Sequence, residues 1–502
     1  MEVVSGMQNE KVALFIIFGG SGDLARRKLY PSLFRLYQKG YLSRHFAVIG
    51  TARRPWENDY YRQIVVDSLN DIQATDEQIA EFAGHFYYQS HDVTNAAHYT
   101  VLKKLADTLD QKYQLQHNRI YYLAMSPNFF GTIAKHLKSE QILTTAGFNR
   151  LIIEKPFGHD YESAAELNQQ IRASFEEDQI YRIDHYLGKE MVQNIAAIRF
   201  GNNIIESLWN NRYIDNIQIT LSEALGVEER AGYYESAGAM RDMVQNHISQ
   251  IATLLAMEPP VSFSARDIRH EKIKVLRSLH IDTPEEAQHN FVRGQYGPAV
   301  IDGQRLEGYR EANNVASDSK TETYVAGKME FENYRWAGVP FYVRTGKRLA
   351  KKETRVDIVY KQLPTNIFKA AQDDNKLGHN ILTIFIEPTE GFSLRVNAKR
   401  LGQGFATRPV DLNFRHSAAA TGNSPEAYER LLLDAMNGDS TNFTHWDELS
   451  QTWKFADVVE KVWSENTPTD FPNYASGSMG PKAADELLAR DGRHWIFSAQ
   501  PK

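Results

Sequence analysis

The distribution of apolar and polar positions divides the chain into two parts with different periodicities. In the first part, short apolar runs alternate with longer stretches of helical periodicity, and the clearest run, Val12–Phe18, has the pattern of a strand buried on both faces of a parallel sheet. Similar runs are His45–Gly50, Asn118–Met125 and Asn149–Phe157, and helical patterns between them include Ala96–Tyr113 and Asn128–Leu143. This alternation predicts an α/β domain of the Rossmann type, with a doubly wound parallel sheet.

Past about residue 200 the pattern changes to segments in which apolar and polar residues alternate. Such alternation is typical of antiparallel strands with one wet face. The strand-like segments are Asn216–Leu225, Thr321–Phe331, Phe341–Arg348, Thr354–Lys361, Asn380–Pro388 and Phe392–Arg400, and helical patterns return in Pro425–Met436 and Trp446–Trp463. We therefore predict residues 1–185 as a dinucleotide-binding domain and residues 186–502 as a larger α+β domain with a mainly antiparallel sheet.

Composition and charge exclude several classes of protein. The 502 residues carry a net charge of −6, with 57 basic and 63 acidic side chains, so no basic excess is available to neutralise a nucleic acid. The chain has no cysteine, which excludes disulfides, thiolate catalysis and Cys-ligated zinc. The longest apolar run is far shorter than the ~20 residues that cross a bilayer, and the first residues lack a signal-peptide pattern. We expect a cytoplasmic protein with no nucleic-acid or membrane partner.

A glycine-rich segment, GGSGDLA, follows directly on the first predicted strand. Gly19 and Gly20 permit a tight turn, Gly22 lets the backbone approach a diphosphate, and Ala25 allows the next helix to pack close to the sheet. The start of that helix offers free N–H groups to phosphates. The loop residues expected to contact a dinucleotide are Gly19, Gly20, Ser21, Gly22, Asp23 and Leu24.

The end of the second predicted strand indicates which dinucleotide binds. The strand runs into Arg53 and Arg54, with no acidic residue before Glu57. An acid at this point takes the ribose 2′-hydroxyl of NAD, whereas an arginine suits the 2′-phosphate of NADP. The other interpretation is a pair of solvated surface arginines. The pattern favours NADP, with NAD as the alternative cofactor.

The segment RIDHYLGKE concentrates charged and aromatic side chains between apolar runs. If Asp184 or Tyr186 begins a helix, His185 and Lys189 are four residues apart and share one face. These two side chains and the Tyr186 hydroxyl would then form a cradle for the phosphate of a sugar phosphate. The alternative is a helix-capping aspartate with ordinary surface charges.

A second cluster, RDMVQNH, places Asp242 and His247 within little more than one helical turn. Oxidation of an alcohol without a metal needs a general base with a pKa near neutrality, and histidine suits that role. The alternative is a histidine satisfied within the core. The chain has no His-x-x-x-His pair with a third helical ligand, so we expect no metal site.

The motifs GGSGDLA, EKPFG, RIDHYLGKE, RDMVQNH and YVRTGKRL, in this order and spacing, resemble the glucose-6-phosphate dehydrogenase family. The resemblance extends from about Val12 to the GSMGP segment near the end, and it is greatest to bacterial members of the lactic-acid-bacterium type. DHYLGKE is much more specific to this family than the glycine loop is. One departure is that residues 124–128 read AMSPN, without the double proline common after this strand in the family.

The resemblance implies oxidation of glucose 6-phosphate at C1 to 6-phosphogluconolactone with hydride transfer to NADP, the first step of the oxidative pentose phosphate pathway. It implies that His247 removes the C1 hydroxyl proton and that Asp184 orients His247. The implied substrate-binding residues are His185, Tyr186, Lys189, Glu223, Asp242, Lys347 and Lys352. Besides the glycine loop, the implied cofactor-binding residues are Arg53, Asp92 and Lys155.

The resemblance also implies a cis Lys155–Pro156 peptide bond and a homodimer formed through the second domain. Two rival hypotheses remain open on the sequence. One is a dehydrogenase of another sugar phosphate. The other is a non-catalytic module that senses NADP(H), although such a module has no use for a general base.

Overall fold

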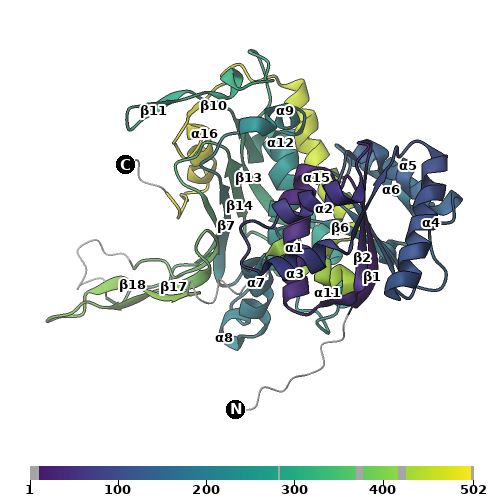
Figure 1. Ribbon diagram of the computed structural model, residues 1–502. Coiled ribbons are helices and arrows are strands. Elements are labelled where there is room, and N and C mark those ends of the chain that lie inside the picture. The colour runs from purple at the N-terminus through teal and green to yellow at the C-terminus, as the bar shows by residue number, and fades with distance from the viewer. Residues whose placement is uncertain (1–10, 281–282, 369–376, 417–425, 499–502) are drawn as a thin grey trace, which may run out of the picture. The chain divides into compact units, whose positions relative to one another are not determined.

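The computed structural model describes residues 11–280, 283–368, 377–416 and 426–498. The chain forms two compact units (Figure 1). The first unit consists of the chain up to Gly188 together with Phe263–Arg269 and Pro425–Ser450, and the second consists of the remainder. The predicted division at residue 185 uses continuous pieces of chain, whereas the first compact unit also contains two later segments.

The first unit is built on a seven-stranded sheet. Its strands are β1 (Lys11–Phe18), β2 (Leu42–Ala52), β3 (Phe86–Ser90), β4 (Arg119–Leu123), β5 (Asn149–Ile153), β6 (Ile180–Ile183) and β19 (Phe443–Thr444). Their spatial order is β3-β2-β1-β4-β5-β6-β19, and all neighbours are parallel except β6 and β19. The order 3-2-1-4-5-6 defines the dinucleotide-binding α/β fold, so the Rossmann-type prediction is confirmed.

Helices cover both faces of this sheet (Figure 1). One face carries α1 (Tyr30–Gln38), α2 (Asn58–Asp67) and α3 (Asp76–Ala83), and the other carries α4 (Ala96–Tyr113), α5 (Phe130–Ser139) and α6 (Tyr161–Arg172). Every residue from Ala13 to Phe18 is at most 1% exposed. Phe15 packs in one core with Phe34 of α1, and Phe18 lies 6.3 Å, ring centre to ring centre, from Tyr99 of α4. The continuous apolar run of β1 therefore reflects burial on both sides.

A helix from late in the chain completes the first core. In α14 (Ala427–Asn437), Leu431 and Leu432 belong to the same buried cluster as α1. Arg150 of β5 donates hydrogen bonds of 2.8 and 2.7 Å to the carbonyl oxygens of residues 435 and 436 at the end of the helix, where carbonyl groups lack partners within the helix. The predicted helix is confirmed from Ala427 onward, and Pro425, where the prediction begins, lies outside the described residues.

The second unit is built on a nine-stranded sheet. Its strands are β7 (Ile214–Ser222), β8 (Leu279–His280), β9 (Phe291–Gly294), β13 (Tyr324–Phe331), β14 (Phe341–Gly346), β15 (Glu353–Tyr360), β16 (Ile381–Glu387), β17 (Gly391–Lys399) and β18 (Thr407–Arg415). The order is β18-β17-β16-β15-β7-β14-β13-β8, with β9 also paired to β13. Only β7 and β14 run parallel, so the prediction of a mainly antiparallel sheet is confirmed.

The remaining elements are mostly helices. They are α7 (Glu190–Phe200), α8 (Asn203–Glu206), α9 (Ala231–Ala239), a π-helical segment (Met240–Ile248), α10 (Ser249–Ala256), α11 (Ala265–Leu276), α12 (Pro284–Asn290), α15 (Trp446–Glu465) and α16 (Lys482–Ala489). Short strands are β10 (Tyr296–Gly297), β11 (Ala299–Ile301), β12 (Gln304–Leu306) and β20 (Tyr474–Ala475). Among the described residues, no helix combines the length and apolar character that a membrane span requires.

Candidate functional site

The glycine loop is a tight turn at the carboxyl end of β1. Gly19 has φ +94°, and a Cβ there would lie 2.2 Å from the carbonyl oxygen of Ala124, so only glycine fits. The N–H groups of Gly19 and Gly20 donate to the Thr51 carbonyl at 2.9 and 3.1 Å, and Gly22 N–H donates to Gly19 O at 2.9 Å. The loop therefore folds back on itself and is tied to the end of β2.

The two loops that follow β2 and β3 carry the charged residues predicted to contact a cofactor. Arg53 and Arg54 are exposed, and the Arg54 guanidinium lies 5.2 Å from the Trp56 ring centre. Asp92 accepts hydrogen bonds from the Thr94 N–H and hydroxyl at 2.9 and 2.8 Å. These bonds, with a smaller contribution from Arg53, lower the pKa of Asp92. Asp92 is therefore an anionic hydrogen-bond acceptor at neutral pH.

Lys155 follows β5 at the same edge of the sheet. The Lys155–Pro156 bond is cis, as the resemblance implied. The preceding Glu154 accepts a 2.5 Å hydrogen bond from the Tyr122 hydroxyl of β4. In the AMSPN segment after β4, Ala124 N–H donates to Phe18 O at 2.8 Å, so this segment lies directly beside the glycine loop.

The glycine loop, Arg53, Asp92 and Lys155 thus all follow carboxyl ends of parallel strands. In open α/β sheets, ligands bind at this edge, near the point where the strand order reverses between β1 and β4. The residues present fit a dinucleotide: a cramped glycine turn for a diphosphate and two exposed guanidinium groups for a further phosphate.

The RIDHYLGKE segment forms a turn rather than the start of a helix. Asp184, which is 3% exposed, follows β6 and accepts a 3.0 Å hydrogen bond from Tyr186 N–H. Leu187 N–H donates to Asp184 O at 3.0 Å. A Cβ at Gly188 would lie 2.8 Å from the carbonyl oxygen of Ala427, so the backbone is closely packed there.

Helix α7 begins only at Glu190. The expectation that a helix begins at Asp184 or Tyr186 is therefore wrong, because an aspartate side chain that bonds the N–H two residues on stabilises a turn. His185 and Lys189 do not share a helix face. The His185 ring is nearly parallel to the Tyr428 ring, at 6.5 Å and 9°.

In the second unit, Glu223 and Lys347 lie together at one edge of the sheet. They follow β7 and β14, which are parallel and pair Ser222 with Gly346. The Lys347 ammonium group donates to Glu223 Oε2. Lys352 precedes β15, whose first residue, Glu353, pairs with Ser222, so Lys352 belongs to the same edge. Three residues that the resemblance implied for substrate binding are thus placed together by strand register.

A residue that the sequence analysis missed joins two of the predicted lysines. Glu387, the last residue of β16, accepts from Lys189 Nζ at 2.5 Å and from Lys352 Nζ at 2.6 Å. Burial tends to raise the pKa of Glu387, but the two ammonium groups outweigh burial, so the pKa is lowered. The sequence offered one signal for Glu387, which is an acidic residue at the end of a predicted strand and directly before a proline.

Asp242 and His247 lie on the π-helical segment Met240–Ile248 and are 3% and 1% exposed. The i→i+5 bonding of a π-helix places residues five apart one turn from each other, on the same side. The segment begins after Gly238, which has φ +65°, and its first N–H, from Met240, donates to Glu322 Oε1 at 3.0 Å. The structure therefore brings Asp242 and His247 together on one face.

Tyr234 connects this helix with the sheet edge. The Lys347 ammonium group lies 5.4 Å from its ring centre. Burial, followed by the negative charges of Asp242, Glu322 and Glu223, raises the pKa of the Tyr234 hydroxyl. Asp242, Glu223 and Lys347 consequently surround one neutral, buried phenol.

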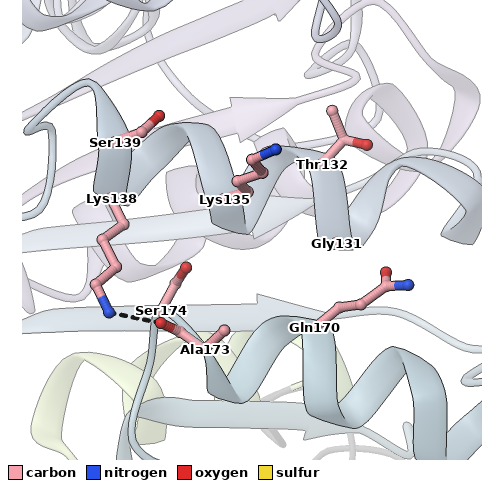
Figure 2. Close-up of a pocket in the computed structure, with 8 residues that line it drawn as sticks. All are labelled: Gly131, Thr132, Lys135, Lys138, Ser139, Gln170, Ala173 and Ser174. Carbon is pink, nitrogen blue, oxygen red and sulfur yellow. Dashed lines mark hydrogen bonds between the residues drawn. The ribbon is translucent and has the colours of Figure 1, made fainter.

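A separate groove lies between α5 and α6 (Figure 2). Its lining residues are Gly131, Thr132, Lys135, Lys138, Ser139, Gln170, Ala173 and Ser174. Lys138 Nζ donates to Ala173 O at 2.6 Å across this groove. None of these lining residues belongs to the predicted site, so the groove is not part of the candidate functional site.

The first unit has a dinucleotide-binding fold with the glycine loop and charged residues at one sheet edge, and the second, α+β unit has a charged sheet edge of its own. Together these features define an oxidoreductase. Two family models match the chain: glucose-6-phosphate dehydrogenase, NAD binding domain, over residues 16–194, and glucose-6-phosphate dehydrogenase, C-terminal domain, over residues 196–496. The chain belongs to the glucose-6-phosphate dehydrogenase family.

Individual relatives agree with this membership. Glucose-6-phosphate 1-dehydrogenase of Streptococcus pneumoniae serotype 4 is 54% identical over 96% of both chains. The enzyme of the same name from Leuconostoc mesenteroides is 49% identical, over 98% of this chain and all of the relative. A solved glucose-6-phosphate dehydrogenase in complex with glucose-6-phosphate superposes with a TM-score of 0.89 at 35% identity, covering 98% of this chain and 100% of that one. The expected resemblance to bacterial members is confirmed.

Proposed function

We propose that the protein oxidises D-glucose 6-phosphate at C1 to 6-phospho-D-glucono-1,5-lactone and transfers the hydride to NADP⁺. The reaction is the first step of the oxidative pentose phosphate pathway. The observation that carries the proposal is the 54% identity to a glucose-6-phosphate 1-dehydrogenase over 96% of the chain. The two family models, over residues 16–194 and 196–496, include both the glycine loop and the charged sheet edge. The nucleotide, when bound, supplies the hydride acceptor.

His247 is the proposed general base. It takes the proton of the C1 hydroxyl while the hydride leaves C1, and Asp184 pairs with the imidazole to hold its tautomer and stabilise its positive charge. A positioned general base contributes roughly 10²–10⁴ in rate, or about 3–5 kcal/mol of activation free energy. Burial of His247 supports this role, because exclusion of water strengthens the interaction with a carboxylate.

The substrate phosphate is assigned to His185, Tyr186, Lys189 and Lys352. The proximity of Lys189 and Lys352 to the single carboxylate of Glu387 supports this assignment, because a phosphate dianion can replace the carboxylate as their common partner. Glu223, Asp242 and Lys347 are assigned to the sugar hydroxyls. Binding of the remote phosphate would align C1 with the acceptor, so phosphate contacts should influence kcat as well as KM.

The cofactor is assigned to the glycine loop, Arg53, Asp92 and Lys155, with NADP preferred and NAD as the alternative. The exposed arginines and the absence of an acid before Glu57 support the preference. The proposal includes a homodimer formed through the second unit. Leu412 and Phe414 of the edge strand β18, at 58% and 45% exposure, support an apolar contact there.

A spectrophotometric assay tests the reaction. Purified protein with NADP⁺ and glucose 6-phosphate should give a steady rise in the absorbance of the reduced nicotinamide. Faster turnover of galactose 6-phosphate or 2-deoxyglucose 6-phosphate would instead identify a dehydrogenase of another sugar phosphate. Binding of NADP⁺ with no turnover of any of these sugars would favour a sensing module and contradict the proposed activity.

A further inference from the structure

Three buried tyrosines form a cluster next to two loops of the first unit, the glycine loop and the arginine loop, which follows β2 and carries Arg53 and Arg54. Tyr30 comes from α1, Tyr61 from α2 and Tyr88 from β3, and all three side chains are buried. The ring centres of Tyr30 and Tyr61 are 6.0 Å apart, and those of Tyr61 and Tyr88 are 5.2 Å apart. None of these residues has a role in the proposed reaction. The hydroxyls of Tyr30 and Tyr88 nevertheless bond backbone carbonyls of the two loops, and the hydroxyl of Tyr61 bonds Tyr30.

Tyr30 acts on the glycine loop. Its hydroxyl donates to the carbonyl oxygen of Gly20, and the Tyr61 hydroxyl lies 2.8 Å from that of Tyr30. Because the Tyr30 proton is used on Gly20, Tyr61 is the donor to Tyr30. In a trans peptide the carbonyl and the following N–H point in opposite directions. Fixing Gly20 C=O toward the tyrosines therefore turns Ser21 N–H away from them, toward the loop's other side.

Tyr88 acts on the arginine loop. Its hydroxyl lies 2.8 Å from the carbonyl oxygen of Arg54 and 3.1 Å from that of Ala52. Arg53 is the residue between these two carbonyls. The single hydroxyl proton is shared between these two carbonyls, which also accept from the N–H groups of His91 and Trp56 at 2.8 and 3.0 Å. Tyr88 therefore adds to the restraint on the backbone at both sides of Arg53, and a restrained backbone has less freedom to lose when an anion binds.

Tyr61 packs against strand β2 where the strand meets the glycine loop. A Cβ at Gly50 of β2 would lie 2.0 Å from the Tyr61 hydroxyl, and a Cβ at Gly20 would lie 2.8 Å from Gly50 Cα. The two glycines thus allow the strand and the glycine loop to lie close to each other and to the tyrosine hydroxyls. Burial raises the pKa of Tyr88 to about 12, and burial raises the pKa of Tyr30 as well, so both hydroxyls remain donors at physiological pH.

We propose that Tyr30 and Tyr88 are positioning residues with separable effects on nucleotide binding. Tyr30, supported by Tyr61, sets the loop for the diphosphate that NADP and NAD share. Tyr88 sets the loop whose Arg53 contacts the 2′-phosphate that only NADP carries. The inference rests on the proposed function, because it uses the cofactor assigned there.

Equilibrium titration of the full-length protein with NADP⁺ and with NAD⁺ tests the proposal. Tyr88→Phe should raise the Kd for NADP⁺ about 5- to 10-fold and change the Kd for NAD⁺ less than about 2-fold, since a lost hydrogen bond is equivalent to roughly a 10-fold change in affinity. Tyr30→Phe should raise both values by about 5- to 10-fold.

Two variants serve as references. Arg53→Ala reports the loss of the 2′-phosphate contact itself and should affect NADP⁺ selectively. Tyr121→Phe removes a buried hydroxyl that lies 3.1 Å from Ile142 O, away from both cofactor loops, and should leave both Kd values unchanged. A purely structural role for Tyr88 would not change the ratio of the two Kd values.

Equal shifts for both nucleotides in Tyr88→Phe, or no shift in Tyr30→Phe, would overturn the proposal while leaving the proposed function intact. If Tyr30→Phe fails to fold, Tyr61→Phe replaces it, because it removes only the donor to Tyr30; it should raise both Kd values by a smaller factor, and no change would count against the proposal. A wild-type protein that binds neither nucleotide would overturn the proposed function and this inference together.

Discussion

At position 247 an imidazole is held almost entirely out of solvent, one turn from the Asp242 carboxylate. A histidine satisfied within the core was the alternative interpretation of this residue. His247 lies on the π-helical segment that also carries Asp242, and Asp242 acts together with Glu223 on the hydroxyl of Tyr234. This placement supports the proposed role of His247. The role itself is decided by substitution.

His247→Asn should lower kcat by about 10²-fold or more. The asparagine amide is similar to imidazole in size and polarity, but it cannot accept a proton as a general base does. The Kd values for NADP⁺ and glucose 6-phosphate, measured by direct binding, should change less than about 3-fold. Steady-state kinetics give the first quantity and calorimetry the second. A loss of activity smaller than 10-fold would remove His247 as the base.

Single residues of the site differed in how visible they were in the sequence. The glycines, Arg53 and the histidines belong to motifs, and their types alone indicate their chemistry. Glu387 and Tyr88 belong to no motif, because their roles depend on partners far along the chain that only folding brings near. The helix expected at Asp184 failed for a related reason: its carboxylate bonds a local N–H and stabilises a turn.

Among the described elements, two π-helical segments lie at or next to residues of the proposed site, Ala25–Leu29 after the glycine loop and Met240–Ile248. In an α-helix, residues five apart point about 140° away from each other. The π-helical bonding therefore decides whether Asp242 and His247 share a face. Sequence periodicity does not reveal this geometry. The segment follows Gly238, whose φ is +65°.

Strands were predictable where apolar residues form a continuous run or alternate with polar ones, and strands without either pattern, such as β6 and β18, were missed. The run Val12–Phe18 was found because every side chain is apolar. Strand β6 was missed because it contains Arg182, whose buried guanidinium donates to Glu177 at 2.5 and 3.1 Å and to Asn168 Oδ1 at 2.6 Å. Strand β18 was missed because it contains Pro409 and exposes most of its side chains, as edge strands do.

The contact between the π-helical segment and α15 gives the fold a pH dependence. Arg241 donates to Glu460 Oε2 of α15 at 3.1 Å. Burial raises the pKa of Glu460 to about 8, with Glu322 and Asp457 adding to this effect and Arg241 and Arg293 opposing it. Native Glu460 therefore keeps a proton that the unfolded chain releases near its ordinary pKa. Stability is lost as pH rises from about 5 to about 8, because the native state binds more protons there.

Glu460→Gln should flatten that loss, because the amide cannot ionise and still accepts from Arg241. Thermal unfolding at pH 5 and pH 8 gives the comparison: Tm should fall more on going to pH 8 in the wild type than in the variant. Glu465→Gln, at an exposed position of the same helix, is the control and should follow the wild type. Parallel Tm profiles for wild type and Glu460→Gln would show that Glu460 does not cause the dependence.

At the scale of the whole molecule, the nucleotide-binding unit is not a continuous piece of chain. Leu431, Leu432 and Phe443 belong to its core, and β19 pairs with β6. Local patterns show that α14 has an apolar stripe, but they do not show which core receives that stripe. A division of the sequence at one residue therefore cannot assign α14 and β19 to the first unit, because they lie far along the chain from its other elements.

A fragment ending at Gly188 should lack a cooperative thermal transition, because removal of α14 exposes apolar side chains of the first core. The measurement is circular dichroism with temperature. The same fragment joined through a flexible linker to residues 426–450 is the matched comparison and should regain a transition. A cooperative transition in the short fragment alone would show that α14 and β19 are dispensable for folding.

The carboxylate of Glu387 between Lys189 and Lys352 has one more consequence. If the substrate phosphate binds these two lysines as proposed, it has to displace Glu387 as their counter-ion, so its affinity is the difference between two ion pairings rather than the strength of one. An uncharged sugar brings nothing to compete with Glu387, and a phosphate ester that becomes a monoanion below about pH 6 competes less well than a dianion. In the proposed site, Glu387 would therefore make the lysine pair selective for ligand charge before any sugar hydroxyl is recognised.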